Sequence, residues 1–476
     1  MKPCVSSQSR ATCRSLLLGA AVAALVAAPA GAAEPPLPAF NADITQTSVS
    51  GISSGAYMAV QFGTAWSSII TGVGAIAGGP FGCSEGSASE ALSTCTGGAP
   101  PPDLPELIKR TDAWSSGGGI DDTGKIAAQK IYLFHGYNDT VVAQPVADSL
   151  QGFYAHYLGA HAGNLFFQTA IGAGHAQVTG GYGGACSTTG GEFINNCGYD
   201  QAGILLQHIY GALAPRNDGA LTGRFLAFNQ GQFTAPDPPN DDSMDDKGFV
   251  YIPASCDAKQ PCRVHVALHG CMQSVGNIGE DFVRHAGYNE WADTNRIIVL
   301  YPQTHALLLS DQGLTNPQAC WDWWGYLDAD PEESPTYLLK SGKQIRAIKA
   351  MVDRLTSGAL AQPYPPASPP VLPLGAPAKL LAPDRTDTAI DLVWSPVPGA
   401  TRYDIFRAGP DEEDFHQVGT ASGSSYGDAG LKPGSQYRYR VRASAAEGET
   451  LYSPIAAQAT LPLVPACDDP GDCPVR

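Results

Sequence analysis

A proline-rich segment limits what the chain can fold into, because it separates two stretches of different sequence pattern. Residues 361–377 read AQPYPPASPPVLPLGAP, with a proline at every second or third position. Proline has a fixed φ and no backbone N–H, so this segment can neither continue a helix nor pair as a central strand. We therefore expect a stiff linker between separate domains. The expected parts are a leader over 1–32, a first domain over 33–360, the linker over 361–376, a second domain over 377–462 and a short cysteine-containing tail over 463–476.

The leader has the residue order of a secretory signal peptide. Three basic residues precede the apolar run 16–28, and small residues follow at Ala30, Gly31 and Ala32. This order predicts cleavage near Ala32 or Ala33. The apolar run is too short for a stable membrane anchor, and no later stretch approaches the ~20 apolar residues that a spanning helix needs. We therefore expect a secreted protein, extracellular or periplasmic, without stable membrane insertion.

Acidic residues outnumber basic residues, 45 to 28, which gives a formal net charge of −17. Removal of the leader with its three basic residues moves this charge to −20. A chain this acidic repels phosphate backbones, which argues against nucleic acid as a partner. The charge suits a neutral or apolar substrate better than a polyanion. The sequence leaves the oligomeric state open.

Ten cysteines remain after the leader with Cys4 and Cys13 is removed from the twelve. An even number in a secreted chain predicts disulfides. No CxxC pair occurs, and spacings of six to twelve residues are poor for zinc, so we expect neither a metal nor another cofactor. Pairing of sequence neighbours is the expectation, although the sequence alone leaves the pairing open. The neighbours are Cys83 and Cys95, Cys186 and Cys197, Cys256 and Cys262, Cys271 and Cys320, and Cys467 and Cys473.

The second domain has the pattern of a β-sandwich. Its apolar runs AIDLVW, RYDIFRA and YRYRVRAS are short, alternate with polar residues and are separated by Pro, Gly and Asp turns. Trp394 and the later stretch around Leu431, Pro433 and Gly434 resemble a fibronectin type III domain, with Tyr437 in the tyrosine-corner position. The resemblance implies a fibronectin type III β-sandwich. We expect it to act as a spacer, with binding of a carbohydrate or polymer as the alternative.

The first domain alternates strand and helix patterns. The segments 44–51, 130–139, 263–270 and 296–303 are apolar and β-branched and read as strands, whereas 54–68 and 335–358 read as helices. Alternation of this kind predicts a parallel sheet covered on both faces, an α/β fold.

A G-x-S-x-G motif, Gly51-Ile52-Ser53-Ser54-Gly55, lies between the first expected strand and the helix after it. That context suits a nucleophile, because the small residues allow a tight turn and the helix start offers N–H groups to an oxyanion. The same motif recurs around Ser425, but there it lies between strands of the second domain with no helix after it. We therefore expect Ser53 to be the nucleophile and Ser425 to have no catalytic role.

A serine nucleophile needs a base and an acid that orients the base. In the order serine, acid, histidine that α/β-hydrolases use, Asp139 follows the strand KIYLFHG and His175 lies in the glycine-rich stretch IGAGHAQVTGGYGG. Both positions fit, so Ser53, Asp139 and His175 form the expected triad. Competing acids are Asp121, Asp122 and Asp200, and competing histidines are His135, His156, His161, His208, His265, His269 and His285.

The segment VHVALHGCMQS is out of the usual order. It resembles the oxyanion-hole strand and loop that normally precede the nucleophile, yet here it lies far downstream of Ser53. A long helix pattern then ends near Leu355, where the nucleophile strand would usually begin. Because the ends of a domain are commonly close together, a circularly permuted α/β-hydrolase fold explains this order.

These features together resemble the esterase/polyhydroxybutyrate depolymerase family in its permuted extracellular form. The resemblance rests on GISSG near the mature start, HGYND, GAGH, and the late LHGC with CWDWWG, and it spans roughly 42–357. It implies a serine esterase that cleaves poly(3-hydroxybutyrate) or its oligomers, a polyester or oligoester substrate, through an acyl-enzyme. Family members of this form add a C-terminal polymer-binding domain, which we expect to be missing here.

The resemblance also implies further roles. The backbone N–H groups of Ser54 and Cys271 would form the oxyanion hole. One of Trp323 and Trp324 would contact the substrate. Core packing is the alternative for any of Trp321, Trp323 and Trp324. Cys271 would be bonded to Cys320, with a free catalytic thiol as the alternative. The alternative enzyme is a feruloyl or acetylxylan esterase, because such esterases share the HGC and CWDWW segments. The alternative outside the enzymes is a non-catalytic matrix-binding protein.

Overall fold

The computed structural model describes residues 34–463 with several gaps. The gaps are 235–241, 258–261, 308–315, 359–376 and the positions 378, 398, 411, 413–414, 446–447 and 454. The leader, the linker, and Cys467 and Cys473 of the tail therefore lie outside the described residues. Within the described residues, no helix combines the length and the apolar character that crossing a membrane requires.

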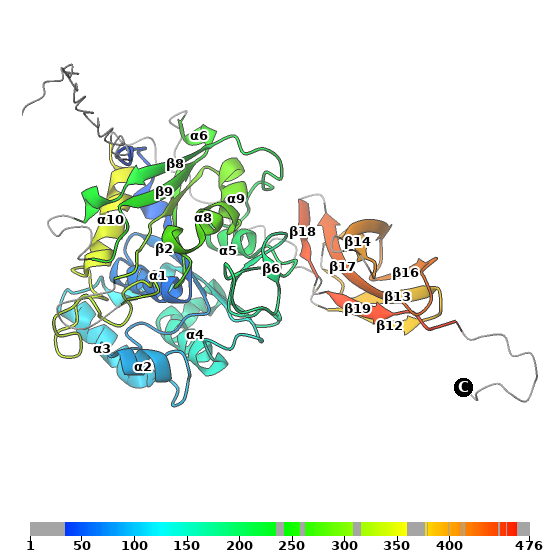
Figure 1. Ribbon diagram of the computed structural model, residues 1–476, viewed down its shortest axis with the longest axis horizontal. Helices are drawn as coiled ribbons and strands as arrows, with labels where there is room; N and C mark the ends of the chain where they lie inside the picture. The colour runs from blue at the N-terminus through cyan, green and yellow to red at the C-terminus, as the bar shows by residue number, and fades with distance from the viewer. Residues whose placement is uncertain are drawn as a thin grey trace, which may run out of the picture. The chain divides into compact units, whose positions relative to one another are not determined.

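The first domain is built on an eight-stranded sheet in the order β4-β3-β2-β1-β10-β11-β9-β8. Figure 1 labels β2, β8 and β9 of this sheet. The six strands from β4 to β11 run parallel, and β9 and β8 are antiparallel. Most of these strands are apolar runs buried on both faces, as a covered parallel sheet requires. Their bounds are β1 Thr47–Ile52, β2 Ile70–Ile76, β3 Lys130–Phe134, β4 Leu165–Gln168, β8 Arg224–Asn229, β9 Lys247–Ile252, β10 Arg263–Leu268 and β11 Ile297–Tyr301.

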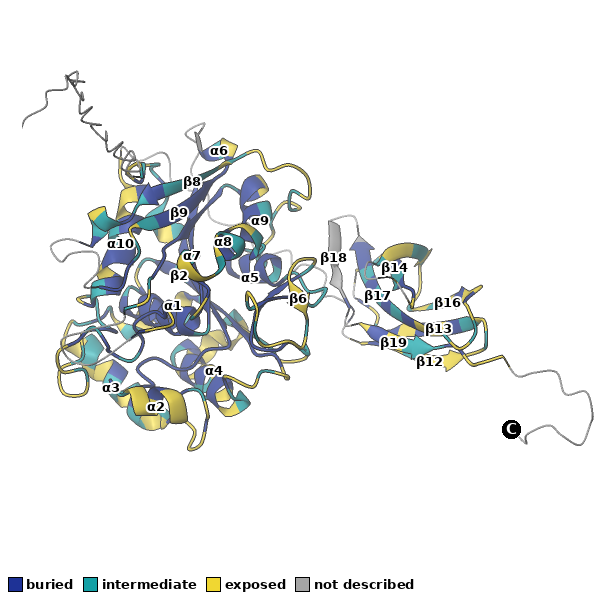
Figure 2. Cartoon of the chain, in the orientation of Figure 1, coloured by how far each residue is buried: buried dark blue, intermediate teal, exposed yellow. Residues whose placement is uncertain are grey.

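Helices cover both faces of this sheet and bury two separate cores. One face packs against α1 (Ser54–Ala65), α3 (Leu104–Ser116), α4 (Gln144–Leu158) and α10 (Lys343–Thr356). The other packs against α5 (Gln201–Tyr210), α8 (Asp281–His285) and α9 (Tyr288–Asn295). Figure 2 shows α1 buried along its whole length, whereas α2 (Ala88–Ser93) is largely exposed.

Smaller elements complete the domain. They are α6 (Ala254–Asp257), α7 (Val275–Ile278), the 3-10 helices η1 (Ile44–Gln46), η2 (Thr123–Ala128), η3 (Gly159–Asn164) and η4 (Gly231–Phe233), and a small sheet β5-β7-β6 of β5 (Gln177–Thr179), β6 (Gly184–Ala185) and β7 (Ile194–Asn196).

The chain order of the strands confirms the circular permutation. The strand β1, which comes first in the chain, lies in the middle of the sheet between β10 and β2. The two ends of the domain meet, because Phe40 N and Ala42 N donate to Leu355 O at 3.1 and 3.2 Å. The end of α10 therefore lies beside the chain that leads into β1, where an unpermuted hydrolase would be continuous.

Two expected elements are shorter in the structure. The strand from Lys130 ends at Phe134, because the chain turns at Gly136, where an added Cβ would lie 2.3 Å from Ala173 O. The last helix starts at Lys343 rather than near 335. Asp328 Oδ2 accepts the N–H groups of Thr336 and Tyr337, so these residues form turns instead of a first helical turn.

Four disulfides of the first domain pair sequence neighbours, as expected. They are Cys83–Cys95, Cys186–Cys197, Cys256–Cys262 and Cys271–Cys320, with sequence separations of 12, 11, 6 and 49. The last of them removes Cys271 as a free thiol. The fifth expected pair lies outside the described residues.

The second domain is a sandwich of two antiparallel sheets with one core. The smaller sheet holds β12 (Leu380–Arg385), β13 (Ala389–Trp394) and β16 (Ser425–Ala429). The larger holds β14 (Arg402–Ala408), β15 (His416–Ala421), β17 (Gln436–Ala445), β18 (Gly448–Tyr452) and β19 (Ala456–Ala459). Trp394 and Tyr439 lie in the shared core. The Tyr437 hydroxyl accepts from Lys432 N at 2.9 Å, the bond of a tyrosine corner. The domain has the fibronectin type III fold, and Ser425 begins a strand there.

Candidate active site

Ser53 lies on a strained turn between β1 and α1. Its φ of 54° and ψ of −124° fall in a region that a non-glycine residue rarely adopts. The turn is tight enough that an added Cβ on Gly51 would lie 2.2 Å from Gly55 O. The Ser53 N–H donates to Ile76 O at 2.9 Å, which ties the turn to the end of β2. This is the geometry that the strand-to-helix context of Ser53 predicts for a nucleophile.

Asp139 and His175 form a buried pair at the same edge of the sheet. Asp139 lies in the loop after β3, and His175 lies in the loop before β5. The His175 Nδ1–H donates to Asp139 Oδ2 at 2.8 Å, and the two side chains are 7% and 1% exposed. The other carboxylate oxygen, Oδ1, accepts the N–H groups of Val141 and Val142 at 2.8 and 3.0 Å.

These contacts fix the charge of Asp139. Burial alone would raise the pKa of the carboxyl, but the hydrogen bond and charge of His175 and the amides of Val141 and Val142 outweigh it and hold the pKa below its ordinary value. Asp139 is therefore a carboxylate at neutral pH and can only accept hydrogen bonds. His175 must then carry its proton on Nδ1, which leaves Nε2 as the basic nitrogen.

The loop of His175 is held from several sides. His175 N donates to Thr189 Oγ1 at 3.0 Å, and Gly174 N donates to Cys186 O at 2.8 Å. The imidazole packs edge to face against Phe193, with ring centroids 6.4 Å apart. The hydrogen bonds of the described residues include none from the Ser53 hydroxyl to His175. The structure thus pairs His175 with Asp139 directly and brings Ser53 to the same edge of the sheet.

The loop after β10 lies directly against the turn of Ser53. An added Cβ on Gly55 would lie 2.3 Å from His269 O, and one on Gly270 would lie 3.3 Å from Ser53 Cβ. The loop is fixed by Trp321 Nε1, which donates to His269 O at 2.9 Å, and by the bond between Cys271 and Cys320.

Two backbone N–H groups at this contact have no acceptor among the hydrogen bonds of the described residues. Ser54 is the first residue of α1, so its N–H has no carbonyl of the helix to bond. The flanking amides of Gly270 and Met272 donate to Gln273 Oε1 and Gln318 O. Among the hydrogen bonds of the described residues, none uses the N–H of Cys271. An oxyanion between Ser54 and Cys271 would therefore meet two free donors.

The three tryptophans of CWDWW have different surroundings. Trp321 is fully buried and supports the loop after β10, and Trp323 is 8% exposed and stacks on Tyr57 with ring centroids 4.1 Å apart. Trp324 is only partly buried and meets Trp323 edge to face at 5.5 Å. Of the two expected substrate contacts, Trp323 therefore belongs to a core and Trp324 keeps accessible surface.

Most of the competing histidines have structural partners. His265 and His269 are fully buried, and burial lowers their pKa values to about 3 and about 4, so both are neutral. His135 Nε2 bonds Val142 O at 2.8 Å and shapes the loop of Asp139. The other positions are His156 in α4, His161 in η3, His208 bonded to Asn164 O and His285 stacked on Tyr182.

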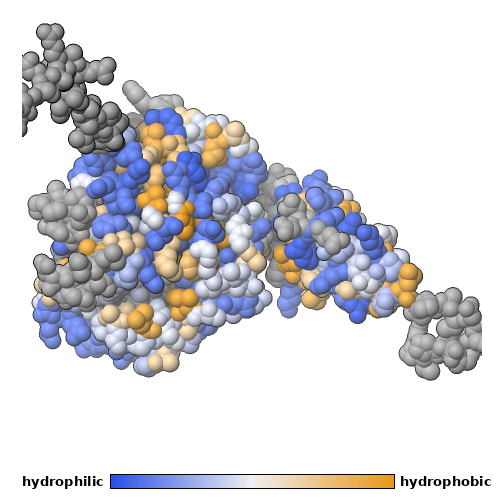
Figure 3. Space-filling view, in the orientation of Figure 1, coloured by the Kyte–Doolittle hydropathy of each residue, from blue (hydrophilic) through white to orange (hydrophobic). Residues whose placement is uncertain are grey.

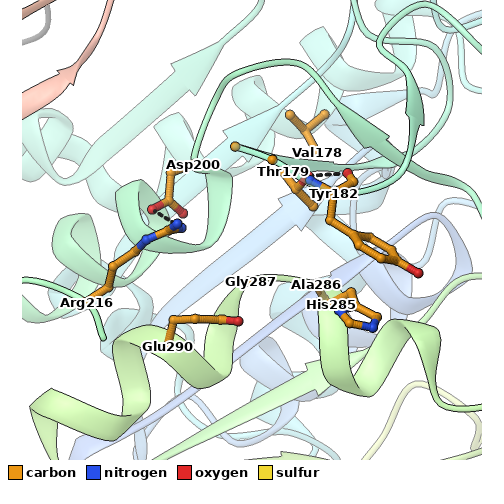
Figure 4. Close-up of a pocket in the computed structure, with 11 residues that line it drawn as sticks. Val178, Thr179, Tyr182, Asp200, Arg216, His285, Ala286, Gly287 and Glu290 are labelled. Carbon is orange, nitrogen blue, oxygen red and sulfur yellow. Dashed lines mark hydrogen bonds and ion pairs between the residues drawn. The ribbon is translucent and has the colours of Figure 1, made fainter. Parts of the chain in front are cut away.

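The competing acids also bind elsewhere. Asp121 accepts from Ser68 and Lys340, and Asp122 and Asp200 cap the N-termini of η2 and α5. Asp200 lines a cavity of about 200 Å³ together with Arg216, Glu290, Tyr182 and His285 (Figure 4). None of Ser53, Asp139 and His175 lines that cavity. Among the described residues, no group of three or more His, Cys, Asp or Glu side chains has the arrangement of a metal site.

Sequence reasoning missed Gln273 and Phe193 as parts of this region. Gln273 Oε1 accepts from Gly270 N at 2.8 Å, and its Nε2 donates to Glu192 O and Phe193 O, each at 2.9 Å. Gln273 stands two positions after Cys271 in HGCMQS, which is the only sequence signal for it. Nothing in the sequence marks Phe193, because its contacts join segments far apart in the chain.

Comparison with known proteins finds relatives over most of the chain. No family model matches the sequence. A poly(3-hydroxybutyrate) depolymerase of Delftia acidovorans is 41% identical over 418 residues, which are 87% of this chain and 78% of the relative. A polyhydroxybutyrate depolymerase of Talaromyces funiculosus is 37% identical over 335 residues, 68% of this chain and 93% of the relative.

Solved structures point the same way. The crystal structure of a PHB depolymerase from Penicillium funiculosum matches with a TM-score of 0.60 and 34% identity, over 67% of this chain and 98% of that chain. A PHB depolymerase complexed with R3HB trimer matches to the same extent. On these identities and coverages, the chain belongs to the polyhydroxybutyrate depolymerase family.

Proposed function

We propose that this protein is a secreted serine esterase that hydrolyses poly(3-hydroxybutyrate) or its oligomers through an acyl-enzyme on Ser53. The observation that carries the proposal is the buried pair of His175 and Asp139, joined at 2.8 Å, at the sheet edge where Ser53 lies on its strained turn. The family relationship supplies the substrate class, because related chains are named as depolymerases of this polyester.

Acylation uses each member of the triad. The Ser53 hydroxyl attacks an ester carbonyl of the polymer and gives its proton to His175 Nε2. Asp139 accepts from Nδ1–H, which keeps the basic nitrogen toward the serine and stabilises the imidazolium that forms. His175 then protonates the leaving alkoxide, so the hydroxyl end of the cleaved chain departs and the acyl end stays on Ser53.

The tetrahedral intermediate carries its negative charge on the former carbonyl oxygen. The N–H groups of Ser54 and Cys271 are the donors proposed for this oxyanion, and the loss of one such donor costs about 3 kcal/mol of barrier reduction. The start of α1 adds a favourable dipole at the same place. Deacylation repeats the sequence with water, which His175 deprotonates, and releases a 3-hydroxybutyrate acid or an oligomer of it.

Trp324 is the tryptophan proposed to contact the polyester. Trp323 is enclosed by Tyr57 and by the bonded pair of Cys83 and Cys95, so a substrate could reach it only if that cluster opened. Trp324 rests on this cluster with part of its ring accessible, and an aromatic face suits the methyl and methylene groups of an aliphatic polyester.

A site for an apolar polymer is consistent with the surface near the triad. The large exposed hydrophobic side chains include Tyr137 and Val141 on either side of Asp139 and Met272 next to Cys271. Figure 3 shows patches of hydrophobic surface in the central region of the visible face of the first domain, with hydrophilic residues around them.

Secretion is the proposed localisation. The four disulfides require an oxidising compartment, and the leader has the order of a signal peptide. Detection of the mature chain outside the cytoplasm, with its N-terminus near residue 33, is the expected result.

Product analysis tests the substrate class. Purified protein is incubated with amorphous poly(3-hydroxybutyrate) and, separately, with feruloylated xylan, and Ser53→Ala is run beside it. Release of 3-hydroxybutyrate or its dimer from the first polymer alone, by the unmodified protein alone, is expected. Ferulate release without 3-hydroxybutyrate would replace the proposal with a feruloyl esterase. No hydrolysis of either polymer or of p-nitrophenyl butyrate would favour a non-catalytic binding protein.

A further inference from the structure

Gln273 joins the two halves of the proposed catalytic site. Its side chain makes three hydrogen bonds, accepting from Gly270 N at 2.8 Å and donating to Glu192 O and Phe193 O at 2.9 Å each. The residue is 1% exposed, so water does not compete for these groups. Gly270 belongs to the loop after β10, and Glu192 and Phe193 directly precede β7, which pairs with β5 after the loop of His175.

The direction of the amide follows from its partners. A backbone N–H on one side needs an acceptor, and two backbone carbonyls on the other side need donors. Only the orientation with Oε1 toward Gly270 and Nε2 toward Glu192 and Phe193 satisfies all three. A carboxylate of the same shape could serve the first partner but would repel the other two.

Each end of Gln273 leads to a part of the catalytic machinery. Gly270 precedes Cys271, the proposed oxyanion donor, and an added Cβ on Gly270 would lie 3.3 Å from Ser53 Cβ. Phe193 packs against the His175 ring, and its carbonyl also accepts from Gln177 N at 2.8 Å. The side chain of Gln273 thus links Gly270, which precedes the proposed oxyanion donor, to Phe193, which packs against the proposed general base.

We propose that Gln273 is a positioning residue that sets the oxyanion donor of Cys271 and the imidazole of His175 relative to each other. The inference rests on the proposed function of those two groups. The transition state needs both at once, since the oxyanion must meet its N–H donor while Nε2 holds the proton of Ser53. A misplacement of about 1 Å in such a site can cost about 100-fold in rate.

Two variants test this. Gln273→Glu keeps size and the acceptor for Gly270 but loses both donors, and Gln273→Leu loses all three bonds without adding a charge. We expect each to lower kcat for p-nitrophenyl butyrate by roughly 100-fold while KM stays within about threefold, because ground-state binding does not use the oxyanion contact. Gln273→Leu carries the test if Gln273→Glu does not fold.

Gln230→Glu is the matched control. Gln230 is also fully buried, accepts from Gln303 N at 2.9 Å, and donates to Asp245 O and Gln303 O at 2.6 and 2.8 Å. It makes the same three kinds of bond but contacts neither Gly270 nor the loop of His175. We expect this variant to lose about as much thermal stability as the Gln273 variants. Its kcat should stay within about twofold of the unmodified protein, because Gln230 shares no hydrogen-bond partner with the proposed catalytic site.

Two further readouts separate positioning from general damage. An alkyl boronic acid, which mimics the tetrahedral intermediate, should bind each Gln273 variant more weakly in proportion to the loss in kcat/KM. In Gln273→Glu the ratio of variant to unmodified kcat should also rise as pH falls and the new carboxyl regains a donor, whereas the ratio for Gln273→Leu should not change with pH.

The outcomes distinguish the inference from the proposed function. If the unmodified protein has no esterase activity above Ser53→Ala, the proposed function fails. If it is active and both Gln273 variants keep its kcat and its boronate affinity, or if Gln230→Glu loses kcat equally, the positioning role of Gln273 is refuted while the proposed function stands.

Discussion

Asp139→Asn should leave the site folded but give His175 the wrong tautomer. In the structure Oδ1 accepts two backbone N–H groups, from Val141 and Val142, and Oδ2 accepts from His175 Nδ1. The single amide oxygen of an asparagine must stay with the two N–H groups. Its NH₂ group then faces Nδ1, which can only accept, so the histidine proton moves to Nε2.

A histidine protonated on Nε2 cannot take the proton of Ser53. The same substitution in a serine protease with this arrangement lowers kcat by about 10⁴-fold, which corresponds to about 5 kcal/mol of transition-state stabilisation. We expect a loss of that size here with KM little changed, because the shape and most hydrogen bonds at position 139 are kept.

The assay is p-nitrophenyl butyrate hydrolysis, with thermal denaturation as the check on folding. Asp121→Asn is the control, since Asp121 is also partly buried and bonded to Ser68 and Lys340 but lies in another loop. It should lose some stability and keep kcat. A kcat for Asp139→Asn within tenfold of the unmodified protein would refute the orienting role of Asp139.

Three further predictions concern other parts of the chain. Burial and the charge of Asp328 raise the pKa of the Asp322 carboxyl to about 7, although the amides of Gly325, Leu327 and Tyr326 act in the other direction. The folded state then holds the proton more tightly than the unfolded state, so the free energy of unfolding should fall as pH rises from about 4 to about 7. Urea unfolding at several pH values measures this fall, which Asp322→Asn should not show. Gly55→Ala would place a Cβ 2.3 Å from His269 O, so it should abolish esterase activity and lower stability by about 1–3 kcal/mol, whereas Gly163→Ala, with open space around it, should do neither. Deletion of 362–476 should cost little activity on soluble esters, because the first domain has its own core. If the shortened protein keeps its activity on soluble esters but no longer hydrolyses amorphous polymer, the fibronectin type III domain binds the polymer.

Local patterns predicted the elements that hold the site. The strand before Ser53 and the helix after it could be predicted from the sequence. A buried β-branched run followed by a glycine-flanked serine is compatible with few other local structures. The permutation was also predictable, since the HGC segment and the last helix follow the nucleophile strand here, whereas an unpermuted hydrolase has them before it. The pairing of Cys83 with Cys95, Cys186 with Cys197 and Cys256 with Cys262 was expected from separations of 12, 11 and 6. The bond between Cys271 and Cys320, 49 positions apart, was implied by the family resemblance.

Other features depend on contacts that no local pattern encodes. The bond from Gln273 to Phe193 joins residues 80 positions apart, and the choice between Trp323 and Trp324 depends on the position of Tyr57 in α1. The last helix was placed too early because its apolar spacing extends to residue 335, while the capture of two N–H groups by Asp328 is a tertiary effect.

Capture of the acyl-enzyme tests the central claim most directly. The protein is mixed with a 3-hydroxybutyrate oligomer, quenched in acid during the first turnovers and digested, and the peptides containing Ser53 and Ser425 are compared by mass spectrometry. The account predicts that the Ser53 peptide alone gains the mass of one or more 3-hydroxybutyryl units. Ser53→Ala should show neither this label nor turnover, whereas Ser425→Ala should show both. A label on another residue, or undiminished turnover by Ser53→Ala, would contradict the account.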